Sequence, residues 1–363
     1  MADGLALTDS AVAWLSEVTE GKSLTSADYA STSGLILDIE GTWVNAPIHD
    51  KNPNFVSPSA PNILDYADGV LRVEGGGHSC EAKYWFQPDF HGASNEYGPL
   101  NNFVYTHADR ARLSPIRGCS MTCTFCNIPY DDPIDVYSLK SIEGSVEAVR
   151  RALEDPAQPA RHVLISGGTP KPKDAGFQRE LYRSVLDAFP NVDVDIMMVP
   201  IAGVLDLAEL KAHGVNELSI NLEVYGRERA REVARQKYNQ GVPFYLDFVE
   251  EATNVLGPNT VRSMLLVGLE AIEDTLAGVE AIAERGGVPV LSPFRPDPVT
   301  PLRDTRPPSA EELRDVYLRA RDIAERHGVA LGPSCPPCSH NTLNFAEDLA
   351  GTITYPYIAP LTR

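Results

Sequence analysis

Three cysteines on one short stretch constrain this chain more than any other feature of its sequence. Cys119, Cys123 and Cys126 have the spacing C-x3-C-x2-C, and the aromatic residue Phe125 precedes the third. Three thiolates on such a loop can hold three irons of a [4Fe–4S] cluster, which leaves the fourth iron open to a ligand. A structural zinc site normally has four nitrogen or sulfur ligands, and we expect no disulfide framework in a long chain without a secretory leader. The spacing therefore predicts an iron–sulfur cluster.

The same loop, with its aromatic residue at Phe125, resembles the cluster loop of the radical S-adenosylmethionine (SAM) superfamily. The resemblance implies that the open iron binds the amino and carboxylate groups of SAM. It also implies that one electron cleaves SAM to methionine and a 5′-deoxyadenosyl radical, and that a flavodoxin or ferredoxin type protein donates the electron. Chemistry of this kind belongs to the cofactor, while the protein binds and orients the reactants.

The charge of the chain indicates a small-molecule substrate. Its 363 residues carry a formal net charge of −19 at pH 7, and no block is rich in Lys or Arg. Binding to nucleic acids requires a basic surface that neutralises phosphates, so we expect no nucleic-acid partner. No apolar run approaches the ~20 residues that span a bilayer, and residues 1–20 contain no basic residue of a signal peptide. We therefore expect no membrane partner and a reducing, cytoplasmic location.

From residue 112 onward, short apolar strands alternate with amphipathic helices. This alternation predicts a parallel sheet with helices outside it. Strands are expected near residues 113, 163, 194, 219, 264 and 290. Six strands are too few to close an eight-stranded barrel, and a partial barrel is also what the resemblance implies. We therefore predict an α/β fold with an N-terminal extension (1–111), a partial (β/α)6 TIM-like radical SAM barrel (112–296) and a C-terminal helix and tail (297–363).

The clearest expected helix runs from Ser309 to His327, because Ser309 and Glu312 have the spacing of a capping box. In the extension we expect a helix at 11–18 and strands at 34–39 and 69–74, separated by a loop rich in Pro and Asn. The remaining barrel helices are expected at 141–154, 177–189, 205–212, 227–238, 244–256 and 275–285.

Two glycines follow the second barrel strand, where catalytic barrels place their active residues. Gly167 and Gly168 allow the backbone to approach a ligand closely, and Thr169 comes next. The segment resembles the family's Gly-Gly-Glu motif, in which the backbone binds the SAM amino group, although Thr169 stands where Glu is usual. A simple strand-to-helix turn is the alternative interpretation.

A carboxylate emerges from the fourth barrel strand at Glu223, two residues after Asn221. An unpaired buried acid is costly, and a cationic ligand would offset that cost. The Asn-Leu-Glu run resembles the fourth strand of lipoyl synthase and its relatives, which implies that the acid contacts SAM. Arg235 matches the family's basic position after this strand and would bind the SAM carboxylate. Gly268, after the fifth strand, resembles a backbone segment that contacts adenine.

A second cysteine pair lies near the C-terminus, at Cys335 and Cys338, with prolines between. A thioredoxin-like redox pair is one interpretation. The other is an auxiliary iron–sulfur cluster that Cys335 and Cys338 share with Cys80, with His340 or His78 as a further ligand. A structural Cys80 and a tail without a metal remain the third interpretation.

The sequence thus predicts a radical SAM enzyme that most resembles the biotin synthase and lipoyl synthase branch. The 5′-deoxyadenosyl radical would take a hydrogen atom from an unactivated carbon of a small molecule. An auxiliary cluster would support sulfur insertion or oxidation. A single-cluster enzyme for rearrangement, decarboxylation or coupling is the first alternative, and a non-catalytic iron–sulfur or zinc protein is the second. The sequence names neither the substrate nor a catalytic residue.

Overall fold

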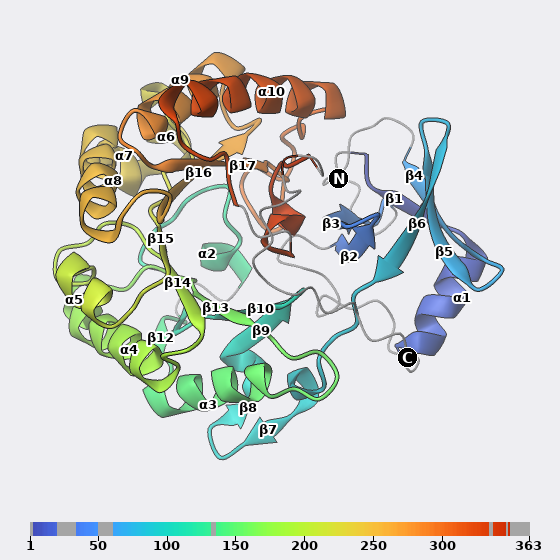
Figure 1. Ribbon diagram of the computed structural model, residues 1–363, viewed down its shortest axis with the longest axis horizontal. Coiled ribbons are helices and arrows are strands. Elements are labelled where there is room, and N and C mark those ends of the chain that lie inside the picture. The colour runs from blue at the N-terminus through green and yellow to red at the C-terminus, as the bar shows by residue number, and fades with distance from the viewer. Residues whose placement is uncertain are drawn as a thin grey trace.

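The computed structural model describes residues 3–19, 34–49, 61–131, 136–333, 337–345 and 348. Two large sheets dominate this part of the chain, one of six strands and one of seven. In Figure 1 the smaller sheet, from the N-terminal part, lies on the right, and the larger sheet curves through the left with helices around it.

The N-terminal sheet has the strand order β1-β4-β5-β6-β2-β3 and carries α1 against β4. Trp14 of α1 stacks on Tyr66 of β4, with ring centroids 4.9 Å apart. The predicted helix and two predicted strands are present as α1, β2 and β5. Four further strands, β1, β3, β4 and β6, were not predicted; of these, β3 and β4 lie in the segment that was interpreted as loop. The bounds are β1 Leu5–Leu7, α1 Asp9–Val18, β2 Gly34–Ile39, β3 Thr42–Pro47, β4 Asn62–Ala67, β5 Val70–Gly75 and β6 His78–Tyr84.

The larger sheet is the predicted partial barrel, with strand order β17-β16-β15-β14-β13-β10-β9. Six of its strands run parallel in sequence order, and β9 pairs antiparallel at one edge. The strands are β9 Val104–His107, β10 Arg110–Leu113, β13 His162–Ile165, β14 Asp193–Met197, β15 Glu217–Ser219, β16 Val261–Val267 and β17 Val288–Pro293.

Helices surround the curved sheet (Figure 1). Most lie where the sequence predicts them, but the helix expected at 227–238 is broken at Ala234, whose φ is −142°. No helix among the described residues is both long and apolar enough to cross a membrane. The helices are α3 Ile142–Leu153, α4 Ala175–Ala188, α5 Leu207–Ala212, α6 Arg227–Val233, α7 Arg235–Gln240, α8 Val242–Leu256, α9 Ile272–Ala283 and α10 Ala310–His327.

Short elements connect these units. Those near the barrel mouth are β11 Ile116–Arg117, α2 Ile128–Asp131 and β12 Ser138–Leu139. The others are η2 Asp89–Gly92, β7 Ser94–Asn95, β8 Gly98–Pro99, η3 Leu100–Asn102, η4 Pro172–Asp174 and η5 Pro337–Asn341.

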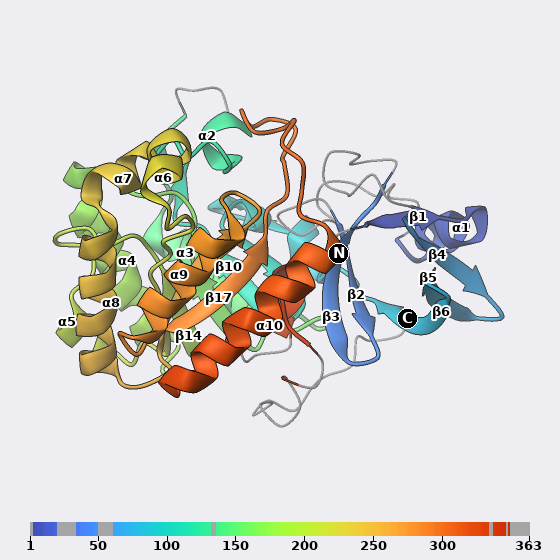
Figure 2. The same ribbon diagram turned by 90° about the horizontal axis from the view of Figure 1, so that it is seen from above.

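The open side of the partial barrel, between β17 and β9, is covered by the tail and by the β2–β3 hairpin. The tail follows β17, because Ser292 donates its hydroxyl to the carbonyl of Asn341 (2.8 Å). Asn45 of β3 then donates its side-chain N–H to the side-chain oxygen of Asn341 (2.8 Å). In Figure 1 the red tail lies between β17 and β3, and Figure 2 shows β2 and β3 as the part of the N-terminal sheet nearest the barrel. Segments from both ends of the chain therefore complete the wall of the barrel.

We expect Ser309→Ala to destabilise the protein by about 1 kcal/mol, because it removes an N-cap. Ser309 accepts the backbone N–H of Glu312 (3.2 Å), and the Glu312 carboxylate accepts the N–H of Ser309 (2.7 Å), so the capping box is formed as predicted. Denaturant unfolding measures the loss. Ser309→Asp keeps the acceptor and is the control, and equal losses in both variants would contradict the capping role.

Candidate active site

The cluster loop, residues 119–126, lies between β11 and α2 and is held by backbone hydrogen bonds on two sides. The N–H of Ser120 donates to the carbonyl of Thr169 (3.0 Å), in the turn after β13. The N–H of Thr124 donates to the carbonyl of Val233 (2.9 Å), at the end of α6. Contacts within the protein therefore fix the loop, independently of any metal.

The three cysteines of this loop suit a cluster with one open iron. The Cys119 sulfur accepts the N–H groups of Met121 (3.3 Å) and Thr169 (3.1 Å), as a thiolate ligand would. Burial raises the pKa of Cys123 to about 12, and the nearby negative charge of Glu223 adds to this effect. Burial likewise raises the pKa of Cys126 to about 12. Iron must displace protons from these thiols, so cluster assembly should become easier as the pH rises.

The two glycines after β13 pack directly against the cluster loop. A Cβ on Gly168 would lie 1.7 Å from the carbonyl oxygen of Gly118. Gly167 has φ +136°, and a Cβ there would lie 2.7 Å from the Ser114 hydroxyl. The close backbone approach that the sequence predicts is present, but its observed partner is the cluster loop. Thr169 is buried, and its carbonyl already accepts the Ser120 N–H.

Glu223 pairs with a cation that the sequence analysis did not identify. Its carboxylate lies 2.8 Å from Lys237 Nζ, which also donates to the carbonyl of Asn221 (2.7 Å). The Glu223 backbone has φ +67°, an unusual conformation for a non-glycine residue. It is held there by hydrogen bonds to Met264 and Leu266 of β16. Strain of this kind is concentrated at functional sites.

The other predicted SAM-binding residues lie in different surroundings. Phe125 lines the cavity described below. Asn221 is buried, and its side-chain oxygen accepts from Ser219 and from the N–H of Met264, so it links β15 to β16. Gly268 has φ +100° and packs against Pro308. Arg235 is exposed at the start of α7 and is absent from the cavity lining. The buried cation beside Glu223 is therefore Lys237, not Arg235.

A cavity of about 350 Å³ fills the interior of the barrel beneath the cluster loop. Cys126 and Phe125 line its upper part, together with Gly167 and Glu223 from the strand ends. Arg295 also lines the cavity and donates to the carbonyl of Asn45 (2.9 Å). The charged side chains of the lining are Arg110, Arg112, Glu223, Arg262, Arg295 and Asp297.

Several of these interior charges were not predicted, although the sequence carries a signal for them. Arg262 of β16 is buried and forms ion pairs with Asp195 of β14 (2.9 Å) and Glu217 of β15 (2.8 Å). In β10 and β14, charged residues alternate with apolar ones. Alternate side chains of a strand point to opposite faces, so this period of two marks the side chains that enter the barrel.

Cys338 also lines the cavity, and it contacts a buried histidine. Its sulfur lies 3.0 Å from His162 Nε2, and His162 Nδ1 lies 3.7 Å from the carboxylate of Asp109. Burial by itself would lower the pKa of His162. The charge of Cys338 and its hydrogen bond to the imidazole, together with the negative charge of Asp109, outweigh burial and raise this pKa to about 9. The tail thiol is thus part of the barrel interior.

The structure does not bring Cys80 to Cys338. Cys80 pairs with Val73 near the tip of the β5–β6 hairpin, whereas the tail meets β3 at Asn45. Cys80 of β6 and Asn45 of β3 are two strands apart across the sheet and about five residues apart along the strands. Standard strand geometry converts these separations to roughly 20 Å. Ligands of one cluster lie much closer together, so this arrangement does not support the ligand set with Cys80, which stays a prediction. The remaining predicted ligand, Cys335, lies outside the described residues.

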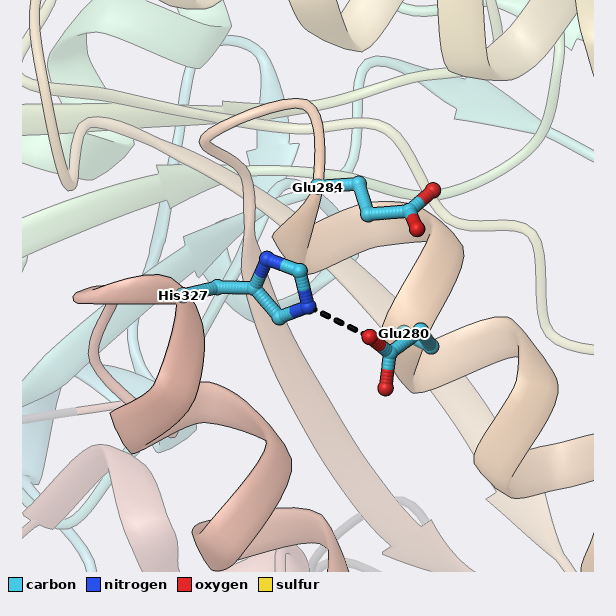
Figure 3. Close-up of side chains that lie close together, drawn as sticks. All are labelled: Glu280, Glu284 and His327. Atoms are coloured by element: carbon cyan, nitrogen blue, oxygen red, sulfur yellow. Dashed lines mark hydrogen bonds and ion pairs between the residues drawn. The ribbon is translucent and has the colours of Figure 1, made fainter.

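Outside the barrel, Glu280, Glu284 and His327 lie close enough together to hold a metal ion (Figure 3). Glu280 and Glu284 belong to or adjoin α9, and His327 ends α10. The Glu280 carboxylate, however, already accepts from His327 and from Arg326 (2.9 Å). We interpret this cluster as a set of ion pairs that joins α9 to α10.

Residues 113–286, which include the cluster loop and most of the barrel, match the family model of the radical SAM superfamily. The family match implies that family's two cofactors, a [4Fe–4S] cluster and SAM. Cys119, Cys123 and Cys126 supply a suitable set of three thiol ligands for the cluster.

The individual relatives are distant. A bacteriochlorophyllide c C-7(1)-hydroxylase of Chlorobaculum limnaeum is 25% identical over 126 residues, which cover 32% of this chain and 31% of that protein. A radical SAM methyltransferase from Sphaerobacter thermophilus has a TM-score of 0.48 at 14% identity, covering 79% of this chain and 80% of the other. The hydrogenase maturase HydG from Carboxydothermus hydrogenoformans has a TM-score of 0.47 at 19% identity, covering 62% and 54%. None of these three is a biotin or lipoyl synthase, so the predicted branch has no support among them.

We expect Gly168→Ala to prevent cluster assembly, because the new Cβ would overlap the Gly118 carbonyl and displace the loop. Iron per chain and the visible absorption of anaerobically reconstituted protein measure the effect. Gly176→Ala is the matched control, since a Cβ at Gly176 meets no atom within 4 Å. A folded Gly168→Ala variant with a full complement of iron would show that this contact is dispensable.

Glu223→Gln should lower stability by about 3–5 kcal/mol, because it leaves the Lys237 charge buried without its carboxylate. The double variant Glu223→Gln/Lys237→Met should recover most of this loss. If Glu223 also contacts SAM, both variants should bind SAM about tenfold more weakly or worse. Unfolding and SAM binding are measured on the same reconstituted proteins. Wild-type SAM affinity in the double variant would restrict Glu223 to a structural role.

Proposed function

We propose that this chain is a radical SAM enzyme that cleaves SAM reductively and removes a hydrogen atom from a carbon of a small molecule. The observation that carries the proposal is the position of the C-x3-C-x2-C loop, whose Phe125 and Cys126 line the 350 Å³ cavity of the barrel. When bound, the cluster supplies the electron that cleaves SAM. A site inside the barrel suits a reactive radical, because it limits contact with water and side reactions.

The residues around the loop would have separate roles in binding the cluster and SAM. Cys119, Cys123 and Cys126 would hold the cluster. The Gly167–Gly168 turn fixes the loop and exposes backbone beside the cavity, where the SAM amino group would bind. Glu223, whose charge Lys237 balances, faces the same space and would contact a polar group of SAM. We propose these roles from position and chemistry.

The chain spans about a third of the length of the curated relative it matches, and we treat its substrate as open. By its name, that relative hydroxylates a carbon of a bacteriochlorophyllide, which agrees with attack on a carbon. The position of Cys80 does not support its role as a ligand of the auxiliary cluster that would serve sulfur insertion or oxidation. We therefore favour a single-cluster enzyme for rearrangement, decarboxylation or coupling, with an electron donor of the flavodoxin or ferredoxin type.

Anaerobically reconstituted protein should bind about four irons per chain at the cluster loop and release 5′-deoxyadenosine when SAM and dithionite are added. The Cys119/Cys123/Cys126 triple alanine variant should do neither, because it lacks the ligands. A Cys80→Ala variant is the control and should behave as wild type. Zinc in place of iron, or iron without SAM cleavage, would contradict the proposed function and favour a non-catalytic metalloprotein.

A further inference from the structure

Two arginines of β10 form one wall of the cavity. Arg110 and Arg112 are two residues apart on this strand, and both line the cavity. Ala111 and Leu113, which alternate with them, are completely buried in the core cluster with residues of α3. The strand thus directs two guanidinium groups into the barrel on the same side.

Two other charged side chains of the cavity lining, Arg262 and Glu223, have partners of opposite charge. Arg262 meets Asp195 and Glu217, and Glu223 meets Lys237. Arg112 is half-buried, and its Nε donates to the neutral hydroxyl of Ser166 (3.0 Å). Across the part of the chain that the structure describes, neither Arg110 nor Arg112 has a carboxylate within ion-pair distance.

Arg110 carries a second sign of an incomplete site, since its Nε is buried without a hydrogen-bond acceptor. Buried polar groups are nearly always hydrogen-bonded, and exceptions call for an explanation. His107 of β9, which pairs with Arg110 across the strands, lines the same space. Burial holds the pKa of His107 well below its usual range, so this imidazole is neutral and does not supply an anion.

Burial and repulsion make this wall costly in the absence of a ligand. The pKa of Arg112 is lowered, first by burial and then by the positive charge of Arg110. Arginine nevertheless stays protonated in proteins, so the charge persists. One oxyanion would accept hydrogen bonds from both guanidinium groups at once. Guanidinium groups bind carboxylates and phosphates through such paired hydrogen bonds.

We infer that the Arg110–Arg112 wall binds an oxyanion, a carboxylate or a phosphate, of the enzyme's small-molecule substrate. The inference rests on the proposed function, because it assigns the cavity to the substrate. Ser166 positions the Arg112 guanidinium through its hydroxyl. Arg110 lies two residues farther from the cluster loop than Arg112, about 6.6 Å along the strand. The SAM carboxylate, which binds at the cluster, is the other source of such a group, and it would involve Arg112 rather than Arg110.

The test compares SAM with two anions on reconstituted protein whose cluster is oxidised, so that SAM is not consumed. Sodium phosphate and sodium succinate are titrated in the presence of saturating SAM, with sodium chloride at equal ionic strength as reference. Thermal shift and calorimetry report their binding, and SAM affinity is measured separately. The variants are Arg110→Gln, Arg112→Gln and Arg112→Lys, and Arg314→Gln on the exposed face of α10 is the matched control.

We expect phosphate or succinate to stabilise wild type and Arg314→Gln beyond the effect of chloride. Each cavity variant should bind these anions about tenfold more weakly, the loss of one charge-assisted contact. Arg112→Lys keeps the charge and should lose less than Arg112→Gln. SAM affinity should be unchanged in Arg110→Gln. If circular dichroism shows that Arg112→Gln is unfolded, the anion affinities of Arg110→Gln and Arg112→Lys provide the test.

Three results would overturn the inference. Anions that stabilise wild type no more than chloride would remove the site. Equal anion binding by wild type and the cavity variants would place it elsewhere. Weaker SAM binding in both glutamine variants, with unchanged anion binding, would assign the arginines to the SAM carboxylate. Release of 5′-deoxyadenosine by the same preparations tests the proposed function separately. Arginine-dependent anion binding without SAM cleavage would refute that function but would still support the anion site.

Discussion

The contact between two backbone turns, one before Cys119 and one after β13, is the constraint on which the rest of the site depends. Gly118 and Gly168 approach so closely that no side chain fits between them, and Thr169 then donates its N–H to the Cys119 sulfur. The first and second units of the barrel are thereby joined at the point where a cluster would sit. Both units must be folded before the three thiols acquire their arrangement, so metal binding and barrel folding are coupled.

The barrel is open by construction, and its closure uses chain segments from opposite ends of the sequence. The β2–β3 hairpin and the tail meet through Asn45 and Asn341, and Arg295 of the barrel donates to the Asn45 carbonyl. The N-terminal sheet therefore contributes to the wall of the cavity. A shape complementary to one substrate can evolve in this seam without change to the cluster loop or to the strands that carry it.

The sequence was sufficient for those features that local pattern determines. The alternation of strands and helices and the Ser309–Glu312 capping box both predicted what the structure contains. Features set by contacts between distant segments were not accessible. The partner of Glu223 is Lys237, because the break after α6 turns that side chain inward, which the helical spacing of arginines did not indicate. The separation of Cys80 from the tail depends on strand order in a sheet whose strands were largely interpreted as loop.

The helix break at Ala234 has a consequence for anyone who sets out to stabilise this protein. In a continuous helix the carbonyl of Val233 would accept the N–H four residues later. Here it accepts the N–H of Thr124 (2.9 Å) and its hydroxyl (3.3 Å) instead. Replacing the irregular junction with ideal helix-forming residues would raise local helicity and withdraw that carbonyl from the cluster loop. The junction is therefore a place where thermostability and cofactor retention are set against each other, and consensus-style helix repair should leave it unchanged.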